Sequence, residues 1–209
     1  MAGVGVLLYS GYRLWDPFAG ARQRAAQQVL LHSWQVRDRA RAAEPARAPG
    51  RLPGHHAAAA CTGSDATPRM SQPFAFIQIP AFGRSWKFTV VQGTTLTQLA
   101  TGPGHIPGTA LPGQAGNVGI AAHDITAGNP FLHLGSLRVG DRITITTEQC
   151  VVTYRVTRAP RKVLYTDVAV LRPSGHKHTI TLVTCWPVNL VFDVHRIVVP
   201  GIEVSSVAR

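Results

Sequence analysis

The chain has few acidic residues, few cysteines and no long apolar run. Among its 209 residues, Asp and Glu total 10 whereas Lys and Arg total 21, so the formal net charge is +11. So few carboxylates give no calcium site, and we expect no metal and no cofactor. The positive charge favours acidic partners, but the basic residues do not cluster with aromatic ones in a pattern that reads nucleic acid. We therefore predict no nucleic-acid partner.

The small, odd number of cysteines excludes a disulfide framework. The three are Cys61, in an Ala/Pro-rich stretch, Cys150, at the start of a strand-like run, and Cys185. Nothing in the sequence requires a Cys61–Cys150 bridge, and nothing excludes one. Cys185 is left as the candidate reactive thiol.

The N-terminal part divides into three segments of different composition. The apolar stretch Gly3–Tyr9 is shorter than the roughly 20 residues that span a bilayer. We interpret residues 1–18 as the end of a truncated membrane anchor, with a short amphipathic segment as the alternative. Residues 19–72 are predicted to form a helical segment over 19–43, rich in Ala, Gln and Arg, and then a flexible linker rich in Pro, Ala and Gly.

Residues 73–209 have the pattern of an all-β domain, because short apolar runs alternate with turn residues. Many short strands at close spacing predict a closed barrel or a sandwich. Short helices are expected over Thr94–Ala100 and Asn129–Leu137. The expected strands are Phe74–Ile79, Ser85–Val91, Asn117–Ala122, Asp141–Thr147, Val151–Thr157, Thr179–Cys185 and Val194–Val199.

Three residues of these strands can carry chemistry. Cys185 ends a strand just before Pro187, which cannot donate to a ladder, and His123 follows the apolar run Asn117–Ala122. Arg196 shares a strand face with Val194 and Val198. Taken singly, each has a structural alternative: a buried thiol, a surface histidine or an edge-strand arginine. Taken together, an imidazole can activate the thiol and a guanidinium can stabilise the charge that develops on a substrate carbonyl.

The order of these residues and their surroundings resemble the sortase family, with the arrangement closest to classes D and E. The sequence Thr-Leu-Val-Thr-Cys over Thr181–Cys185, with Arg196 eleven residues later, resembles the cysteine signature of that family. Leu111-Pro112-Gly113 ahead of His123, and Gly128–Phe131 after it, resemble the segments around its catalytic histidine. The chain departs from the commonest residues of the family at Asp124, Trp186 and His195. These departures put the substrate preference implied by the resemblance in doubt more than the implied catalytic chemistry.

The resemblance implies a closed barrel of about eight strands, preceded by a helical or disordered N-terminal extension. It implies a transpeptidase that cleaves an LPxTG-like or LAxTG signal between Thr and Gly through a Cys185 thioester. His123 would transfer protons and Arg196 would hold the substrate carbonyl, while Thr184 and Trp186 would contact substrate. The implied partners are surface proteins bearing sorting signals and an amine of a peptidoglycan precursor or pilin. The implied location is the outer face of a bacterial membrane, with anchoring through the N-terminus.

Three other functions fit parts of the sequence. A cysteine hydrolase would use the same three residues and pass the acyl group to water. A metal-binding surface protein would use His176, His178, His195 and Cys185, although zinc sites usually show tighter ligand pairs. A silent wall-binding module would use only the basic charge. For the enzyme, reference pKa values of about 8.5 for a thiol and about 6.5 for an imidazole predict a bell-shaped pH profile.

Overall fold

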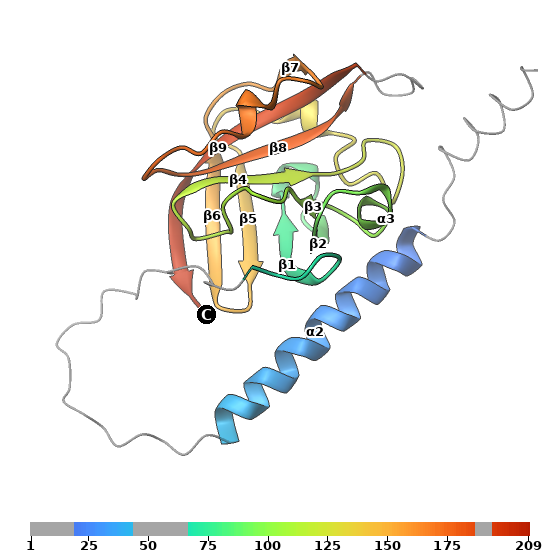
Figure 1. Cartoon of the computed structure of the whole chain (residues 1–209), viewed down its shortest axis with the longest axis vertical. Helices are drawn as coiled ribbons and strands as arrows, with labels where there is room; N and C mark the ends of the chain where they lie inside the picture. The colour runs from blue at the N-terminus through green and yellow to red at the C-terminus, as the bar shows by residue number, and fades with distance from the viewer. Residues whose placement is uncertain (1–18, 44–66, 187–193) are drawn as a thin grey trace, which may run out of the picture.

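The computed structural model describes residues 19–43, 67–186 and 194–209. Its barrel domain contains nine strands in one sheet (Figure 1). The strands are β1 (Pro73–Gln78), β2 (Lys87–Gln92), β3 (Gly104–His105), β4 (Gly116–Ala121), β5 (Arg142–Thr147), β6 (Cys150–Val156), β7 (Arg161–Leu164), β8 (His178–Trp186) and β9 (His195–Ala208). The helices are α2 (Ala19–Ala43) and α3 (Leu96–Leu99), with 3₁₀ turns η1 (Pro80–Phe82), η2 (Leu134–Ser136) and η3 (Val168–Leu171).

Eight of the strands close into a barrel in the order β6-β5-β1-β2-β3-β4-β8-β9, and β9 pairs back onto β6. The ninth strand, β7, lies outside the ring and pairs only with the first part of β9. Gly201 of β9 lies where β9 contacts two strands at once, since it pairs with Ile180 of β8 and with Val156 of β6. A Cβ at Gly201 would lie 2.9 Å from Ile180 Cγ2 and 3.1 Å from the Arg155 carbonyl oxygen, so glycine lets the three strands meet.

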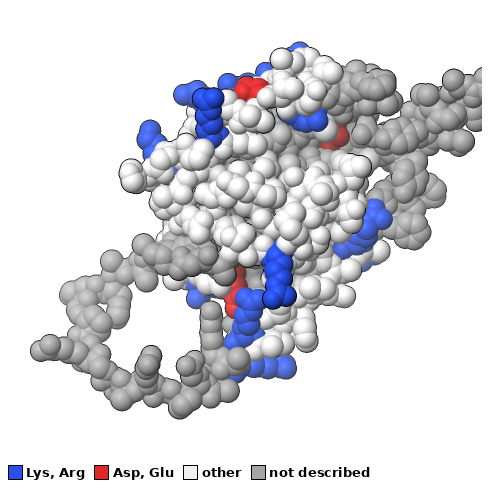
Figure 2. Space-filling view, in the orientation of Figure 1, with Lys and Arg blue, Asp and Glu red and all other residues white. Residues whose placement is uncertain are grey.

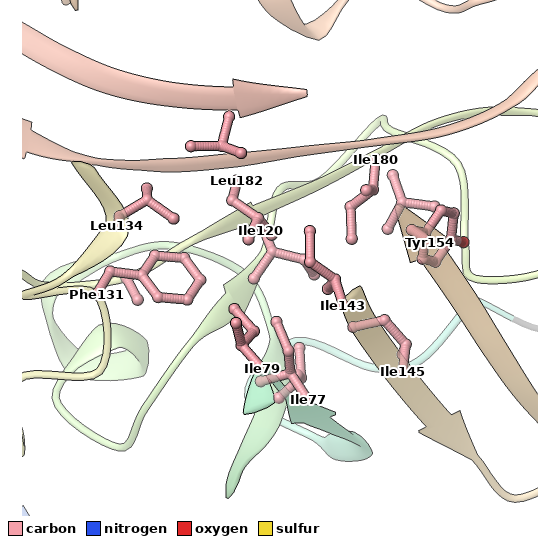
Figure 3. Packing of buried hydrophobic residues seen from close by; sticks show 14 of the residues in the cluster. Ile77, Ile79, Ile120, Phe131, Leu134, Ile143, Ile145, Tyr154, Ile180 and Leu182 are labelled. Atoms are coloured by element: carbon pink, nitrogen blue, oxygen red, sulfur yellow. The ribbon is translucent and has the colours of Figure 1, made fainter. Parts of the chain in front are cut away.

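The core fills the barrel interior with side chains that alternate along the strands. In β5, Ile143 and Ile145 are fully buried while the threonines between and after them are partly exposed. Figure 3 shows these isoleucines beside Tyr154, with Phe131 and Leu134 at the opposite end of the labelled cluster. Leu182 of β8 belongs to this core, three residues before Cys185.

The helix α2 packs against the outside of the barrel, across β1 and β2. Its Leu30 and Trp34 are buried against Phe76 of β1, with the Trp34 and Phe76 rings edge to face at 5.5 Å. Arg37 pairs with the carboxylate of Glu148 in the β5–β6 turn, and Arg22 Nε donates to the Ala100 carbonyl at 3.0 Å. Within the described ranges, no helix combines the length and apolarity needed to cross a membrane.

Most of the expected elements are present, and the differences have local causes. The helix expected over Asn129–Leu137 is wrong: only the 3₁₀ turn η2 forms, because Ala127, Gly128 and Asn129 have positive φ values of 54°, 83° and 55°. The last strand continues to Ala208, well beyond the expected Val199.

Some of the sequence-based expectations concern residues that the structure does not describe. The anchor expected over residues 1–18 and most of the linker lie there, as does Cys61. Cys150, which is described, is disulfide-bonded, whereas Cys185 is not part of a disulfide.

Candidate active site

The pairing of β4 with β8 brings His123 beside Cys185. The two strands are parallel and in register from Gly116 opposite His178 to Ala121 opposite Val183. One residue further on, the Ala122 amide donates to the Val183 carbonyl at 3.1 Å, and the Thr184 hydroxyl donates to the Ala122 carbonyl at 2.8 Å. Beyond the end of β4 at Ala121, these bonds continue the alignment, so His123 comes level with Cys185 of β8.

The backbone of His123 is fixed on its other side as well. Its carbonyl accepts a hydrogen bond from the Phe131 amide at 2.9 Å. Phe131 is fully buried, and its ring stacks on Trp86 with centroids 6.4 Å apart. The loop that carries the histidine is thus attached both to β8 and to the aromatic end of the core.

The antiparallel pairing of β8 with β9 places Cys185 directly opposite Arg196. Leu182 and Ile197 are buried core residues. Cys185 and Arg196 are an odd number of residues away from them on the same strands, so they lie on the opposite, outward face. Opposed side chains on one face of such a pair have Cβ atoms about 4.5–5.5 Å apart. An outward face explains how the charge of Arg196 is tolerated in an otherwise apolar strand.

The guanidinium of Arg196 has two described contacts that limit its position. Its Nη1 donates to the carbonyl of His195 at 2.7 Å. Its Cζ lies 6.0 Å from the ring centroid of Tyr165, which follows β7 and whose amide donates to the Val194 carbonyl at 3.0 Å. The outer strand β7 thus supplies an aromatic wall beside the arginine.

A first hollow of about 370 Å³ contains all three predicted catalytic residues, His123, Cys185 and Arg196. Its other walls come from α3, the β4 end and β8. They are apolar for the most part: Leu96, Leu99, Ala121, Ala122, Ile125 and Val183. Such a lining suits a substrate that carries an aliphatic side chain.

A second hollow of about 260 Å³ also borders Cys185. Phe131, Trp186 and Ile197 line it, whereas His123 and Arg196 are not among its lining residues. Of the two substrate contacts expected from the sequence, Trp186 lines only this second hollow and is 38% exposed. Thr184 lines both hollows, but it is buried and its hydroxyl is bonded to Ala122.

A polar network on the outer face of β4 and β8 holds the turn η3 against the barrel. The Asn117 side-chain amide donates to the Val170 carbonyl at 3.1 Å, and the Thr181 hydroxyl donates to Asn117 Oδ1 at 3.0 Å. Both polar side chains are buried. The network covers the strand face two residues before Val183, which lines the first hollow.

The predicted metal ligands do not converge. Among the residues that the structure describes, no three of His, Cys, Asp and Glu lie close enough to hold a metal ion. His178 instead lies with its Nδ1 3.2 Å from a carboxylate oxygen of Glu203, and His195 pairs across the sheet with Trp186.

Sequence reasoning missed Asp124 as a member of the site. Its side chain lines both hollows and is only 5% exposed, with the Ile125 amide donating to its Oδ1 at 2.9 Å. Its position directly after His123 could have indicated this role, but the sequence analysis treated Asp124 only as a departure from the family pattern. The contribution of α3 to the first hollow was also missed, because Leu96 and Leu99 are far from the motif in sequence.

Comparisons with known proteins agree on one family. The model of the sortase domain matches residues 77–204. The chain belongs to the sortase family. Sortase SrtE1 of Streptomyces coelicolor is 30% identical over 204 residues, which cover 88% of this chain and 50% of that protein. The chain therefore spans about half the length of this curated relative.

Solved sortases share the fold. Sortase E of Streptomyces avermitilis superposes with a TM-score of 0.61 at 33% identity, covering 67% of this chain and 93% of that one. Sortase E1 of Streptomyces coelicolor, solved with a tripeptide in its active site, gives a TM-score of 0.59 at 26% identity, covering 68% of this chain and 94% of that one. Together with a sortase D of Clostridium perfringens, which gives a TM-score of 0.59 at 28% identity and covers 66% of this chain and 83% of that one, these relatives agree with the likeness to classes D and E that the sequence motifs indicated.

Proposed function

We propose that this sortase is a cysteine transpeptidase in which Cys185, His123 and Arg196 act together on a sorting signal. The observation that carries the proposal is that all three side chains line one hollow, with Cys185 and Arg196 directly opposed on β8 and β9. A cysteine outside any disulfide, beside an imidazole and a guanidinium, is the arrangement that acyl transfer through a thioester needs.

In the first half-reaction, the Cys185 thiolate attacks the carbonyl carbon of the scissile peptide bond. Arg196 stabilises the negative charge that develops on the carbonyl oxygen, since its guanidinium is fixed by the His195 carbonyl and the Tyr165 ring. The His123 imidazolium gives its proton to the departing amine, and the C–N bond breaks to leave a thioester on Cys185. An amine then attacks the thioester and restores the thiolate.

The acyl donor is an LPxTG-like or LAxTG peptide cleaved between Thr and Gly. The apolar walls of the first hollow support this choice, because Leu96, Leu99 and Ile125 offer a surface for the leucine of such a signal. The acceptor is an amine of a cell-wall precursor or a pilin, and the enzyme works at the outer face of the membrane. Figure 2 shows the Lys and Arg side chains scattered over the visible face, with white surface between them, which suits contact with an extended anionic wall better than one docking patch.

The test is mass spectrometry of the protein incubated with LPxTG and LAxTG peptides, with and without an added amine. The wild-type protein is expected to give a thioester adduct and, with amine, a new amide product. Cys185→Ala is expected to give neither, while its circular dichroism spectrum stays that of the wild type. A wild-type product made only by hydrolysis would favour the hydrolase, and peptide cleavage that persists in Cys185→Ala would overturn the assignment of the nucleophile.

A further inference from the structure

The helix α2 lies outside the barrel, but its first turns reach the segment that follows α3 (Figure 1). Arg22 Nε donates to the carbonyl of Ala100 at 3.0 Å. The side-chain amide of Gln23 fits in one orientation, in which its nitrogen donates to the Thr101 carbonyl and its oxygen accepts from the amide of Thr89 in β2. Two neighbouring side chains of α2 therefore hold the turn after α3.

A glycine in this turn makes the close approach of α2 possible. Gly102 is buried and has a φ of +143°, a conformation that other residues rarely adopt. A Cβ at Gly102 would collide with the end of the Gln23 side chain and would lie 3.0 Å from the Thr89 carbonyl oxygen. The turn after α3 is thus packed between α2 and β2 with no side chain of its own in the way.

The helix α3 needs such outside support because it has only four residues, Leu96–Leu99. Isolated helices shorter than about 12 residues are marginal in water. Supports are present on two sides: Gln98 Nε2 donates to the Ser71 hydroxyl at 3.2 Å, and Arg22 bonds the Ala100 carbonyl. Carbonyls at a helix C-terminus have no intrahelical partner, and a cation is favourable there. The arginine supplies both the hydrogen-bond donor and the charge.

The position of α3 matters because it forms a wall of the first hollow. Leu96 and Leu99 line this hollow together with His123, Cys185 and Arg196. Leu96 is 80% exposed and Leu99 is partly buried, and neither is a member of the buried core cluster. The place of these two leucines therefore depends on the backbone of α3 and on the contacts that hold it.

We propose that Arg22 and Gln23 are positioning residues for the acyl donor: by holding the turn after α3, the docked helix α2 sets the wall that Leu96 and Leu99 give to the first hollow. The inference rests on the proposed function, since it takes the first hollow as the donor site. It adds a part for the N-terminal helix in substrate binding. The strand β2, on which α2 packs, is separated from β8 by β3 and β4. Loosening α2 should therefore weaken donor binding and leave the reaction of the bound donor almost unchanged.

The first test is steady-state cleavage of the preferred peptide, LPxTG or LAxTG, by the full chain. Arg22→Ala is expected to raise KM about tenfold, the low end of what one methylene is worth in an apolar pocket, while kcat stays within about twofold. Arg22→Lys should recover much of the loss, because an ammonium can still donate to the Ala100 carbonyl. Arg24→Ala, at an exposed arginine of the same helix, is the matched control and should keep the wild-type constants.

Hydrogen exchange shows whether the effect passes through α3. The amides of Leu99 and Ala100 bond to the carbonyls of Thr95 and Leu96, each at 2.9 Å. In Arg22→Ala these two amides should exchange faster than in the wild type, whereas the amides of β8 and β9 keep their protection. A raised KM with unchanged exchange at α3 would contradict the proposed route.

Trp34→Ala tests the same route from another part of the helix. Trp34 is docked on Phe76 of β1 and lines neither hollow, so its removal acts on the first hollow through the docking of α2. We expect this variant to raise KM for the donor as Arg22→Ala does. A wild-type KM in either variant would overturn the part of α2 in donor binding. A wild-type protein that forms no thioester with either peptide would overturn the proposed function instead.

Discussion

Cys185 and Arg196 face each other across the β8–β9 ladder, and the guanidinium is held between the His195 carbonyl and the Tyr165 ring. We expect Arg196→Ala to lower kcat by about 10²- to 10³-fold, the usual cost of removing one oxyanion donor. Arg196→Lys should restore little of this, because an ammonium lacks the planar fork that makes both contacts. Steady-state kinetics with the preferred peptide would measure the loss.

Arg161→Ala is the control for Arg196, since Arg161 is an exposed arginine of β7 that lies opposite Val198 and lines neither hollow. Its kinetic constants should match those of the wild type. Arg196→Ala with wild-type kcat would remove the arginine from the mechanism and leave only Cys185 and His123 in the catalytic set.

The Thr181–Asn117 hydrogen bond supports the outer wall next to the first hollow. Thr181→Val keeps the shape of the side chain but removes the hydroxyl that donates to Asn117 Oδ1. The Thr179 hydroxyl, 3.3 Å from the same oxygen, is the described donor that stays. We expect a loss of about 1–3 kcal/mol in the free energy of unfolding and a higher KM for the acyl donor as η3 loosens. Thr153→Val, at a half-exposed position of β6, is the control for the loss of a hydroxyl. An unchanged KM would show that η3 does not shape the donor site.

The burial of His105 makes the stability depend on pH. His105 is 1% exposed, its Nδ1 lies 2.8 Å from Gln92 Oε1, and its Nε2 lies 2.9 Å from the Ala110 carbonyl. Burial lowers the pKa of His105 from its ordinary 6.5, and the hydrogen bond to Ala110 offsets part of this shift. The unfolded chain therefore takes up a proton that the folded chain resists, and stability falls as the pH drops from 6.5 towards the folded pKa.

Chemical denaturation near pH 7.5 and near pH 5.5 would measure this dependence, with the lower pH expected to give the smaller free energy of unfolding. In His105→Gln the difference between the two pH values should shrink, whereas His176→Gln, in an exposed turn, should keep it. A difference that is the same in all three proteins would assign the pH dependence to other groups.

Most strands of the barrel could be predicted from the sequence, because their apolar residues either alternate with polar ones or form short runs. The two strands that were missed lack this signal. β3 has only the two residues Gly104 and His105, and β7 carries Arg161 and Lys162 with no alternation, since it lies outside the barrel and buries little. The place of β3 depends on pairing with β2 and β4, its neighbours along the chain, and the place of β7 depends on pairing with β9.

His123, Cys185 and Arg196 were singled out from the sequence, since each follows or interrupts an apolar strand and the family motif links them, and the structure places all three along one hollow. The second hollow was not predicted, because its walls come from Phe131, Trp186 and Ile197, which meet only when η2, β8 and β9 pack together. Asp124 was misread for the same reason: a one-dimensional motif shows that it follows His123 but not that it reaches both hollows.

The docking of α2 gives the last prediction. Leu30 and Trp34 bury the apolar side of the helix on Phe76, and Arg209 lies with its Cζ 4.5 Å from the Trp34 ring centroid. The rest of the helix is largely polar, so it depends on this contact rather than on its own propensity. We expect Trp34→Ala to remove most of the hydrogen-exchange protection of α2 while β5 and β6 keep theirs, because the barrel core is a separate cluster.

The control is Gln35→Ala, at the exposed position directly after Trp34, and it should leave α2 protected. Loss of protection in β5 and β6 together with α2 would contradict this, and would make the helix part of one cooperative unit with the barrel.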